Sequence, residues 1–203
     1  TSVIIGFFAM VGSTLIGGTI GALAGYIGGW FDEVISRVTD IFFAVPMILG
    51  AIVVATRVGE MSMWTVIVVL SIFGWTNVAR IMRGAVISTK SQDYVTSSVA
   101  LGASSPSVLL KHVIPNAIAP VIVTATVNLG VFIVAEATLS FLGIGVHSSA
   151  VSWGADISVG RHAAGTQPSM LFYPSVALAI TVLSFIMLGD AVRDALDPKA
   201  RKR

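Results

Sequence analysis

Glu136 is an acidic residue deep within a long apolar stretch, and Ser140 follows it one helical turn later. A carboxylate is costly inside a membrane, so an intramembrane glutamate commonly belongs to a substrate pathway or a proton relay. The other interpretation is a buried structural group, protonated or hydrogen-bonded, with Ser140 or another chain as its partner. The residues alone leave both interpretations open. A proton-coupled secondary transporter centred on Glu136 is accordingly an alternative function.

Several enzyme chemistries have no residues to support them in this sequence. No glycine directly precedes a lysine, so the phosphate-binding pattern G-x-x-x-x-G-K-[ST] is absent and the chain cannot hydrolyse ATP alone. Neither H-E-x-x-H nor G-x-S-x-G occurs. The lack of cysteine excludes thiol catalysis, disulfides and thiolate metal sites. We therefore expect no catalytic residue, cofactor or metal on this chain.

The composition is that of a membrane protein. Of the 203 residues, 55% are hydrophobic and only 11% are charged, against about 25% in an average soluble domain. The mean hydropathy is +0.92. A soluble domain of this size leaves a large share of its surface in water and cannot bury so much apolar material. The expected fold class is an all-α membrane protein, a polytopic helical bundle.

Five stretches are long and apolar enough to cross a bilayer, which takes about 20 helical residues. They lie at about residues 3–28, 38–56, 63–83, 117–142 and 172–190. Pro46 is expected to bend the second of them, because proline removes a backbone hydrogen bond from a helix. The sequence thus predicts a single transmembrane domain over residues 1–203, with long connecting loops at 84–116 and 143–171.

The basic residues divide unevenly between the two sides of such a domain. Two of them, Arg57 and Arg161, fall on one side. The other ten fall on the opposite side: Arg37, Arg80, Arg83, Lys90, Lys111, Arg193, Lys199, Arg201, Lys202 and Arg203. Cytoplasmic loops carry the excess of Lys and Arg, so we expect loop 84–116 and the C-terminus in the cytoplasm and segment 143–171 outside. The basic tail then anchors the last span to anionic lipid, and we expect no nucleic-acid partner.

The polar loop predicts two short capped helices on the membrane surface. Ser91 is placed to cap a helix that starts at Gln92, and Gly102 is placed to stop it. Val95 and Val99, one turn apart, are expected to share a face of this helix.

A second helix is expected to begin after Ser105, with Pro106 in its first position, and to end before Pro115. Its predicted contact surface consists of Val108, Leu109 and His112. A plain connector would need fewer residues and no caps. Apolar residues on a surface that faces water usually mark a partner site, so the loop is interpreted as a docking element.

Small residues recur in the first predicted span. Gly17, Gly21, Gly25 and Gly29 are spaced four residues apart and form one smooth helix face. In a membrane such a face allows close packing of another helix. The alternative is a pore lining, since glycines also widen a path. Packing is the preferred interpretation.

One run in the polar loop is Asp93-Tyr-Val-Thr-Ser-Ser-Val-Ala-Leu-Gly102, followed nine residues later by His112-Val-Ile-Pro115. It resembles the EAA loop of binding-protein-dependent ABC importer permeases, whose pattern is E-A-A, three residues, G, nine residues and I-x-L-P. Thr96, Ser97 and Ser98 stand at the E-A-A positions, so small residues are kept and the glutamate is lost. His112 replaces the usual isoleucine.

Further matches carry the same resemblance over nearly the whole chain. They are Ala24-Gly-Tyr-Ile-Gly-Gly-Trp-Phe-Asp-Glu33, Arg37-Val-Thr-Asp40, Pro46, Glu136-Ala-Thr-Leu-Ser-Phe-Leu-Gly143, Ser152-Trp-Gly154 and Leu188-Gly-Asp-Ala-Val-Arg-Asp-Ala-Leu-Asp-Pro198. They look like the dipeptide/oligopeptide/nickel branch of these permeases, in particular its DppC/OppC-like subunit. The resemblance implies the type I ABC importer permease (MetI-like) fold, with one more span before the five seen here.

The resemblance also implies partners. They are a second permease subunit that forms a heterodimer with this one, two cytoplasmic ABC ATPases that hold ATP and Mg, an external substrate-binding protein, and a transported peptide or related solute such as a nickel chelate. It implies a multi-pass protein of a bacterial or archaeal inner membrane.

The resemblance and the residue patterns described above together give roles for particular residues. The residues expected to couple the permease to the ATPase are Asp93, Tyr94, Thr96, Ser97, Ser98, Gly102, Ala103, Pro106, His112 and Pro115. Trp153 and Arg161 are expected at the outer mouth that receives the binding protein. Those expected to line the pathway or to pack helices are Glu136, Ser140, Gly17, Gly21 and Gly25.

Overall fold

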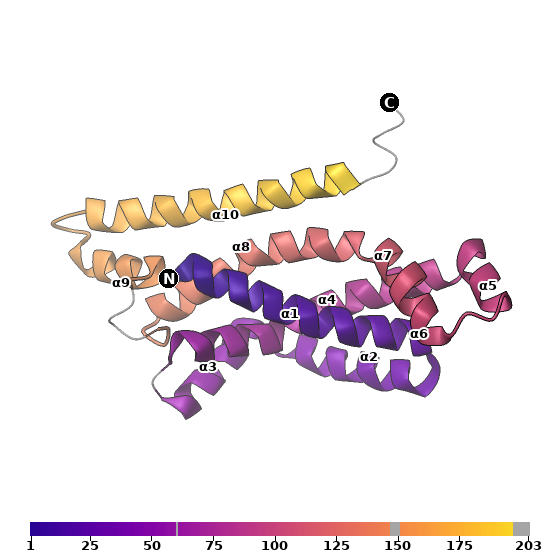
Figure 1. Cartoon of the computed structure of the whole chain (residues 1–203). Coiled ribbons are helices and arrows are strands. Elements are labelled where there is room, and N and C mark those ends of the chain that lie inside the picture. Colours follow the sequence, from indigo (N-terminus) through magenta and orange to yellow (C-terminus); the bar gives the residue numbers. More distant parts are fainter. Residues whose placement is uncertain (60, 147–150, 197–203) are drawn as a thin grey trace.

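Helices make up nearly all of the described chain, because a helix satisfies its own backbone hydrogen bonds and so tolerates apolar surroundings. The computed structural model describes residues 1–59, 61–146 and 151–196, and within these ranges it contains no β-strand (Figure 1). The elements are α1 (Ser2–Ile27), α2 (Gly29–Ala44), α3 (Met47–Val58), α4 (Met63–Lys90), α5 (Asp93–Ala100), α6 (Ser105–Val108), a π-helix (Leu109–Val113), α7 (Ile114–Ala117), α8 (Ala119–Phe141), α9 (Trp153–Ala163) and α10 (Ser169–Leu196).

Four of these helices, α1, α4, α8 and α10, are long and apolar enough to cross a membrane. The helices α2 and α3 are long and apolar enough only as a pair, which is bent by 81° at the break and forms either a fifth, broken crossing or a re-entrant loop. The predicted all-α polytopic class is therefore confirmed. The predicted stretches overlap these helices, but α4 runs seven residues past its expected end, to Lys90.

The prediction of one helix over residues 38–56 is wrong, because α2 ends at Ala44 and α3 starts only at Met47. Pro46 has no N–H to continue the helix, and the residue before a proline avoids helical angles. Val45 indeed has extended backbone angles, φ −98° and ψ 115°. The expected bend at Pro46 is thus a complete break.

The glycine face of α1 packs directly on α4. A Cβ atom on Gly17 would lie 2.2 Å from the carbonyl oxygen of Trp75, and one on Gly21 would lie 2.3 Å from that of Ala79. Such distances leave no room for any side chain. Gly29 does not belong to this face, since it stands in the turn to α2 with φ +57° and open space around it.

The bundle has two buried cores, one toward each end. The first contains Ile5, Leu70 and Phe132, and residues of α3 pack against it. The second contains Val78 and Met82 of α4 together with buried residues of the 93–117 segment. Figure 1 shows α5 and α6 at one end of the bundle, here the loop end, and α3 and α9 at the opposite end.

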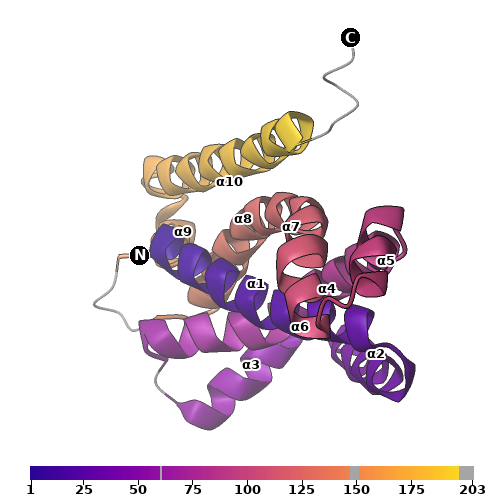
Figure 2. The same cartoon turned by 45° about the vertical axis from the view of Figure 1, so that its right-hand side comes forward.

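The last helix is the least covered. α10 packs against α8 and α9, and Gly189 is its one buried residue among those described. In Figure 2 it lies beside α8, away from α2 and α3. It runs from α9 toward the loop end (Figure 1). The basic tail predicted to anchor it, residues 199–203, lies outside the described residues.

Candidate coupling site

The polar segment between α4 and α8 begins with a helix end tied to its neighbour. The Lys90 ammonium donates hydrogen bonds to the carbonyl oxygens of Gly25, at 2.6 Å, and Tyr26, at 3.4 Å. The last carbonyls of a helix lack partners within the helix, so a lysine there supplies donors and favourable charge. The C-terminal ends of α1 and α4 are thereby joined at the loop end.

α5 begins one residue later than predicted and is capped differently. Its first residue is Asp93, and the preceding Gln92 makes no capping hydrogen bond with its side chain. Ser91 does not cap α5, because its hydroxyl donates back to the carbonyl oxygen of Ser88 in α4 at 3.0 Å. Asp93 still places a negative charge in the first turn, where the helix dipole favours it.

The predicted helix stop at Gly102 is confirmed in detail. The Gly102 N–H donates to the carbonyl oxygen of Val99 at 2.9 Å, and the Ala103 N–H donates to that of Ser98 at 3.2 Å. This hydrogen-bond pair is the Schellman motif, which requires a left-handed residue after the helix. Gly102 supplies it with φ +86°. The direction in which the chain leaves α5 is therefore well defined.

The second helix of the loop differs more from the prediction. α6 starts at Ser105 with Ser104, not Ser105, in the capping position, and Pro106 stands second in the helix. Pro115 does not end it. The chain continues through the π-helix into α7, where Pro115 lies in the first turn. A residue in the first turn of a helix does not need an N–H that donates a hydrogen bond, so proline is tolerated there. The π-helix before it uses i to i+5 hydrogen bonds in place of i to i+4 bonds, and the chain therefore stays helical through Pro115.

The loop is fastened to the bundle by apolar side chains that were not all expected to point inward. Val95, Val108 and Val113 are buried in the second core beside Met82 and Val86 of α4.

The predicted contact surface on the second helix is therefore wrong for Val108 and Leu109, since both are buried within this chain. Val95 and Val99, expected on one face, also separate, because Val95 is buried and Val99 is 54% exposed. Residues four apart in a helix diverge by about 40°, enough to place them on either side of a contact boundary.

Three apolar side chains of α5 and its turn remain exposed among polar ones: Tyr94, Val99 and Leu101, of which Leu101 is 89% exposed. Tyr94 and Leu101 are seven residues apart and share one side of the helix, whereas Val99 lies on another side. We call these three residues the docking surface. The other residues expected to couple differ in exposure. Asp93, Thr96, Ser97, Gly102, Pro106 and Pro115 are exposed, and Ser98, Ala103 and His112 are half-buried.

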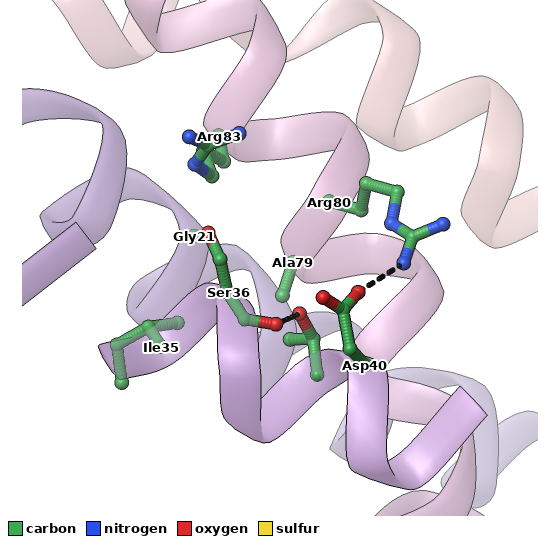
Figure 3. Close-up of a pocket in the computed structure, with 8 residues that line it drawn as sticks. Gly21, Ile35, Ser36, Asp40, Ala79, Arg80 and Arg83 are labelled. Carbon is green, nitrogen blue, oxygen red and sulfur yellow. Dashed lines mark hydrogen bonds and ion pairs between the residues drawn. The ribbon is translucent and has the colours of Figure 1, made fainter. Parts of the chain in front are cut away.

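A charged pocket of about 380 Å³ lies between α1, α2 and α4 (Figure 3). An Arg80 Nη atom lies 3.1 Å from Oδ1 of Asp40, and the Arg80 guanidinium stacks over the Phe43 ring at 4.1 Å. Arg83 binds Asp32 with two nitrogens, and the bond from its Nη2 to Oδ2 measures 2.7 Å. These two ion pairs hold α2 against α4 next to the glycine face of α1.

These ion pairs were not anticipated, since Arg80 and Arg83 entered the prediction only through the charge count. Two signals were available in the sequence. Arg80 and Arg83 are one turn apart on one helix, and Asp32 and Asp40 are about two turns apart on another. Charged side chains on apolar helices are costly unless they are paired, so opposite charges on two such helices are expected to form ion pairs with each other.

Glu136 is fully buried in the interior of the bundle. The Ser140 hydroxyl donates to its Oε1 at 2.7 Å, in the arrangement expected from the one-turn spacing. Its Oε2 has no hydrogen-bond partner in the part of the chain that is described. The segment after α8 covers this region, since a Cβ on Gly145 would lie 2.1 Å from Ser140 Oγ and one on Gly154 would lie 2.0 Å from the Ala137 carbonyl oxygen.

Trp153 and Arg161 belong to α9, at the end opposite the docking surface. Ser152 caps this helix by accepting the Ala155 N–H at 3.2 Å. The Arg161 guanidinium lies 5.2 Å from the centre of the Phe141 ring, which ties α9 to the end of α8. Trp153 is half-buried and lines a groove of about 460 Å³ between α9 and α10. No group of three His, Asp or Glu side chains that could hold a metal ion is found in the described ranges.

Comparison with known proteins agrees with this arrangement. The sequence profile of the family described as "Binding-protein-dependent transport system inner membrane component" matches residues 17–202. The chain is 42% identical to the oligopeptide transport system permease protein OppC of Bacillus subtilis, over 99% of this chain and 66% of that protein. It is 38% identical to the glutathione transport system permease protein GsiD of Pectobacterium atrosepticum, over 97% of this chain and 65% of that protein. It is 36% identical to the dipeptide transport system permease protein DppC of Alkalihalophilus pseudofirmus, over 97% of this chain and 64% of that protein.

The chain thus spans about two thirds of the length of these relatives. Among solved structures, a chain of the inward-facing MetNI methionine ABC transporter shares its fold with a TM-score of 0.76 at 20% identity, over 97% of this chain and 93% of that one. The MetI-like type I permease fold is thereby confirmed. The family match covers most of the sequence, from the second half of α1 onward. This chain belongs to the family of binding-protein-dependent transport system inner membrane components.

Proposed function

We propose that the chain is a permease subunit of an ATP-driven importer that moves peptides or a related solute across the inner membrane. The relatives named above are permeases for oligopeptides, dipeptides and glutathione, which supports this class of solute. The proposed partners are a second permease subunit, two cytoplasmic ABC ATPases that hold ATP and Mg, and an external substrate-binding protein. The chain itself has no catalytic role in this proposal. Nothing in the family relationship supports a proton-coupled carrier centred on Glu136.

The observation that carries the proposal is the docking surface. Tyr94, Val99 and Leu101 expose apolar side chains at a polar end of the bundle, where water would otherwise contact them. Large apolar side chains that are exposed on a well-defined scaffold are typical of a protein interface. The partner proposed for it is the ATPase subunit, since this loop also has the spacing of the EAA loop.

The anchoring of α5 explains how movement of an ATPase would reach the membrane helices. Val95 and Val108 bury the loop in the same core as Met82 and Val86 of α4. Lys90 joins α4 to the end of α1, and Arg83 joins it to α2. A displacement of α5 is therefore transmitted to three membrane helices. Coupling of this kind requires a structural element with two positions, whose equilibrium is shifted both by events at the ATPase and by events at the solute pathway.

In this proposal the loop end faces the cytoplasm and the opposite end faces outward. α9, with Trp153 and Arg161, then forms part of the outer mouth that receives the loaded binding protein. The C-terminal end of α10 lies toward the loop end, so the C-terminus is proposed to be cytoplasmic (Figure 1).

The test compares two variants of the docking surface, Val99→Asp and Leu101→Asp, with a control variant, Val58→Asp. Val58 matches Val99 because both are 54% exposed, but Val58 ends α3 at the opposite end of the bundle. Val99→Asp and Leu101→Asp place a carboxylate in the docking surface, and burial of an unpaired charge at an interface costs several kcal/mol. We expect both to abolish co-purification of the ATPase subunits and ATP-driven uptake, while Val58→Asp retains co-purification.

Membrane levels of each variant, measured by immunoblot, control for insertion. If Leu101→Asp keeps both the ATPase subunits and normal uptake, this loop is not the coupling element and the proposal fails.

A further inference from the structure

Two buried polar side chains, one on α1 and one on α8, are left without partners. Glu136 is fully buried, and its Oε2 has no hydrogen-bond partner among the described residues. Ser2, the first residue of α1, is 3% exposed, and its hydroxyl also has no partner in the described part of the chain. A buried polar group without a partner costs free energy, and native proteins usually satisfy it through another group or an ordered water.

The packing of α1 on α8 brings these two side chains to one interface. A Cβ atom on Gly6 would lie 3.3 Å from the Ile133 backbone nitrogen and 3.4 Å from the Leu129 carbonyl oxygen, so the two helices are in close contact there. α1 runs toward the loop end, and α8 runs away from it (Figure 1). In such an antiparallel pair, the turn before Gly6 on α1 faces the turn after Ile133 on α8. Ser2 and Glu136 occupy these two turns, and both belong to the buried faces of their helices.

The group that completes this interface has to be small and uncharged. The Ser140 hydroxyl already donates to Oε1 of Glu136 at 2.7 Å, so only Oε2 needs a partner. No lysine, arginine or histidine within residues 1–59, 61–146 and 151–196 forms an ion pair with Glu136. A water molecule meets these requirements, because it both donates and accepts and can pair with a carboxyl oxygen and a hydroxyl at once. Buried waters typically join two to four such polar groups.

A cavity next to Ser140 gives water a route to the interface. It measures about 500 Å³, lies at the end opposite the docking surface, and is lined by Ser140, Ser158 and residues 143–146. Ser140 thus borders this cavity and also binds Glu136. The buried carboxyl is therefore one side chain away from a space large enough to hold water.

We propose that Ser2 and Glu136 bind one buried water, which completes a polar link from Ser2 through Glu136 to Ser140. The water pairs with the Ser2 hydroxyl and with Oε2 of Glu136, and so it joins α1 to α8 at the end opposite the docking surface. Glu136 then serves to hold two helices together, and in this conformation it has no surface that a solute could reach. The inference goes beyond the import function and does not depend on it.

A density map of the complete transporter in lipid nanodiscs, at a resolution that shows ordered waters, tests the site directly. In wild type we expect one peak within roughly 2.7–3.2 Å of both the Ser2 hydroxyl oxygen and Oε2 of Glu136. In Glu136→Leu, which has a side chain of similar size without polar atoms, this peak should be lost. The wild-type map decides the question even if Glu136→Leu does not accumulate in the membrane.

Thermal unfolding of the purified transporter measures the strength of the link. Ser2→Ala and Glu136→Leu should each lower the Tm by about 2–10 °C, because each leaves other buried polar groups without a partner. The double variant should lower the Tm by less than the sum of the two shifts, since both changes remove the same water. Glu136→Gln keeps a polar atom at both oxygen positions and should retain most of the wild-type Tm.

Ser13→Ala is the matched control. Ser13 is also a fully buried serine of α1, but its hydroxyl donates to the Met10 carbonyl oxygen of its own helix at 3.0 Å. When Ser13→Ala is combined with Glu136→Leu, the two shifts in Tm should add.

The inference is overturned if the wild-type map shows no water between Ser2 and Glu136. It is also overturned if the Ser2→Ala and Glu136→Leu shifts simply add, as those of the control pair are expected to do. Either result would leave the import function untouched, because neither measurement involves uptake.

Discussion

Two adjacent carboxylates on α2 have very different surroundings. The Asp32 side chain is 18% exposed and binds Arg83 in a bidentate arrangement. The Glu33 side chain is 70% exposed and lies 4.0 Å from Arg37. A bidentate, partly desolvated pair is among the stronger polar interactions, whereas an exposed pair on one helix contributes little. Asp32 therefore connects two helices, whereas the neighbouring Glu33 only faces the surroundings of the protein.

The difference gives a direct prediction. Asp32→Asn should destabilise the purified protein by about 1–3 kcal/mol, because it leaves Arg83 without its carboxylate. Glu33→Gln should change stability by less than about 0.5 kcal/mol. Thermal unfolding in detergent, followed by tryptophan fluorescence, measures both.

Arg83→Gln added to Asp32→Asn removes the unpaired charge and should recover part of the loss. Equal shifts in Tm for Asp32→Asn and Glu33→Gln would show that the Asp32–Arg83 pair does not fasten α2 to α4.

At the scale of elements, the α1–α4 contact is set by backbone approaching backbone. Gly18 points away from the packed face, and a Cβ atom on it would meet nothing within 4 Å, whereas one on Gly21 would lie 2.3 Å from the Ala79 carbonyl oxygen. Backbone atoms cannot rotate away as a flexible side chain can. Any substitution at Gly21 must therefore separate the two helices.

We accordingly expect Gly21→Ala to lower the Tm and the amount of folded protein in the membrane. Gly18→Ala should keep or slightly raise the Tm, since alanine is the better helix former by up to about 1 kcal/mol. Unchanged stability in Gly21→Ala would mean that α1 and α4 can shift apart freely.

The sequence predicts an element well where the interactions that form it are between residues close in sequence, and poorly where they are between distant segments. The long helices, the glycine face of α1 and the stop at Gly102 follow from hydropathy and local backbone preference, and they were predicted. The path through Pro115 was not, because its helical geometry depends on the π turn before it and on the burial of Val113. The inward orientation of Val108 and the pairing of Asp32 with Arg83 are contacts between distant segments. No local pattern specifies which of several possible partners such residues meet.

The whole molecule has chemically different ends. α5 and α6 lie at one end and α9 at the other (Figure 1). The uneven distribution of Lys and Arg predicts that the loop end is cytoplasmic. Lys111 and Arg161 are exposed and lie in the loop segment and in α9 respectively, so they report on the two sides.

Labelling of single cysteines tests this orientation without interference, because the chain has no cysteine of its own. In intact cells a membrane-impermeant thiol reagent should label Arg161→Cys and leave Lys111→Cys unlabelled until the membrane is permeabilised. The reverse pattern would invert the topology and would place the docking surface outside.

The low burial of α10 bears on the order in which the protein is assembled during synthesis. α1, α4 and α8 bury one another's faces, and Gly189 is the one residue of α10 that is buried in the described structure. We therefore expect the first three to pack together before the last helix is made. α10 is then added to a surface that already exists, and its late arrival should not delay the packing of α5 and α6 against α4.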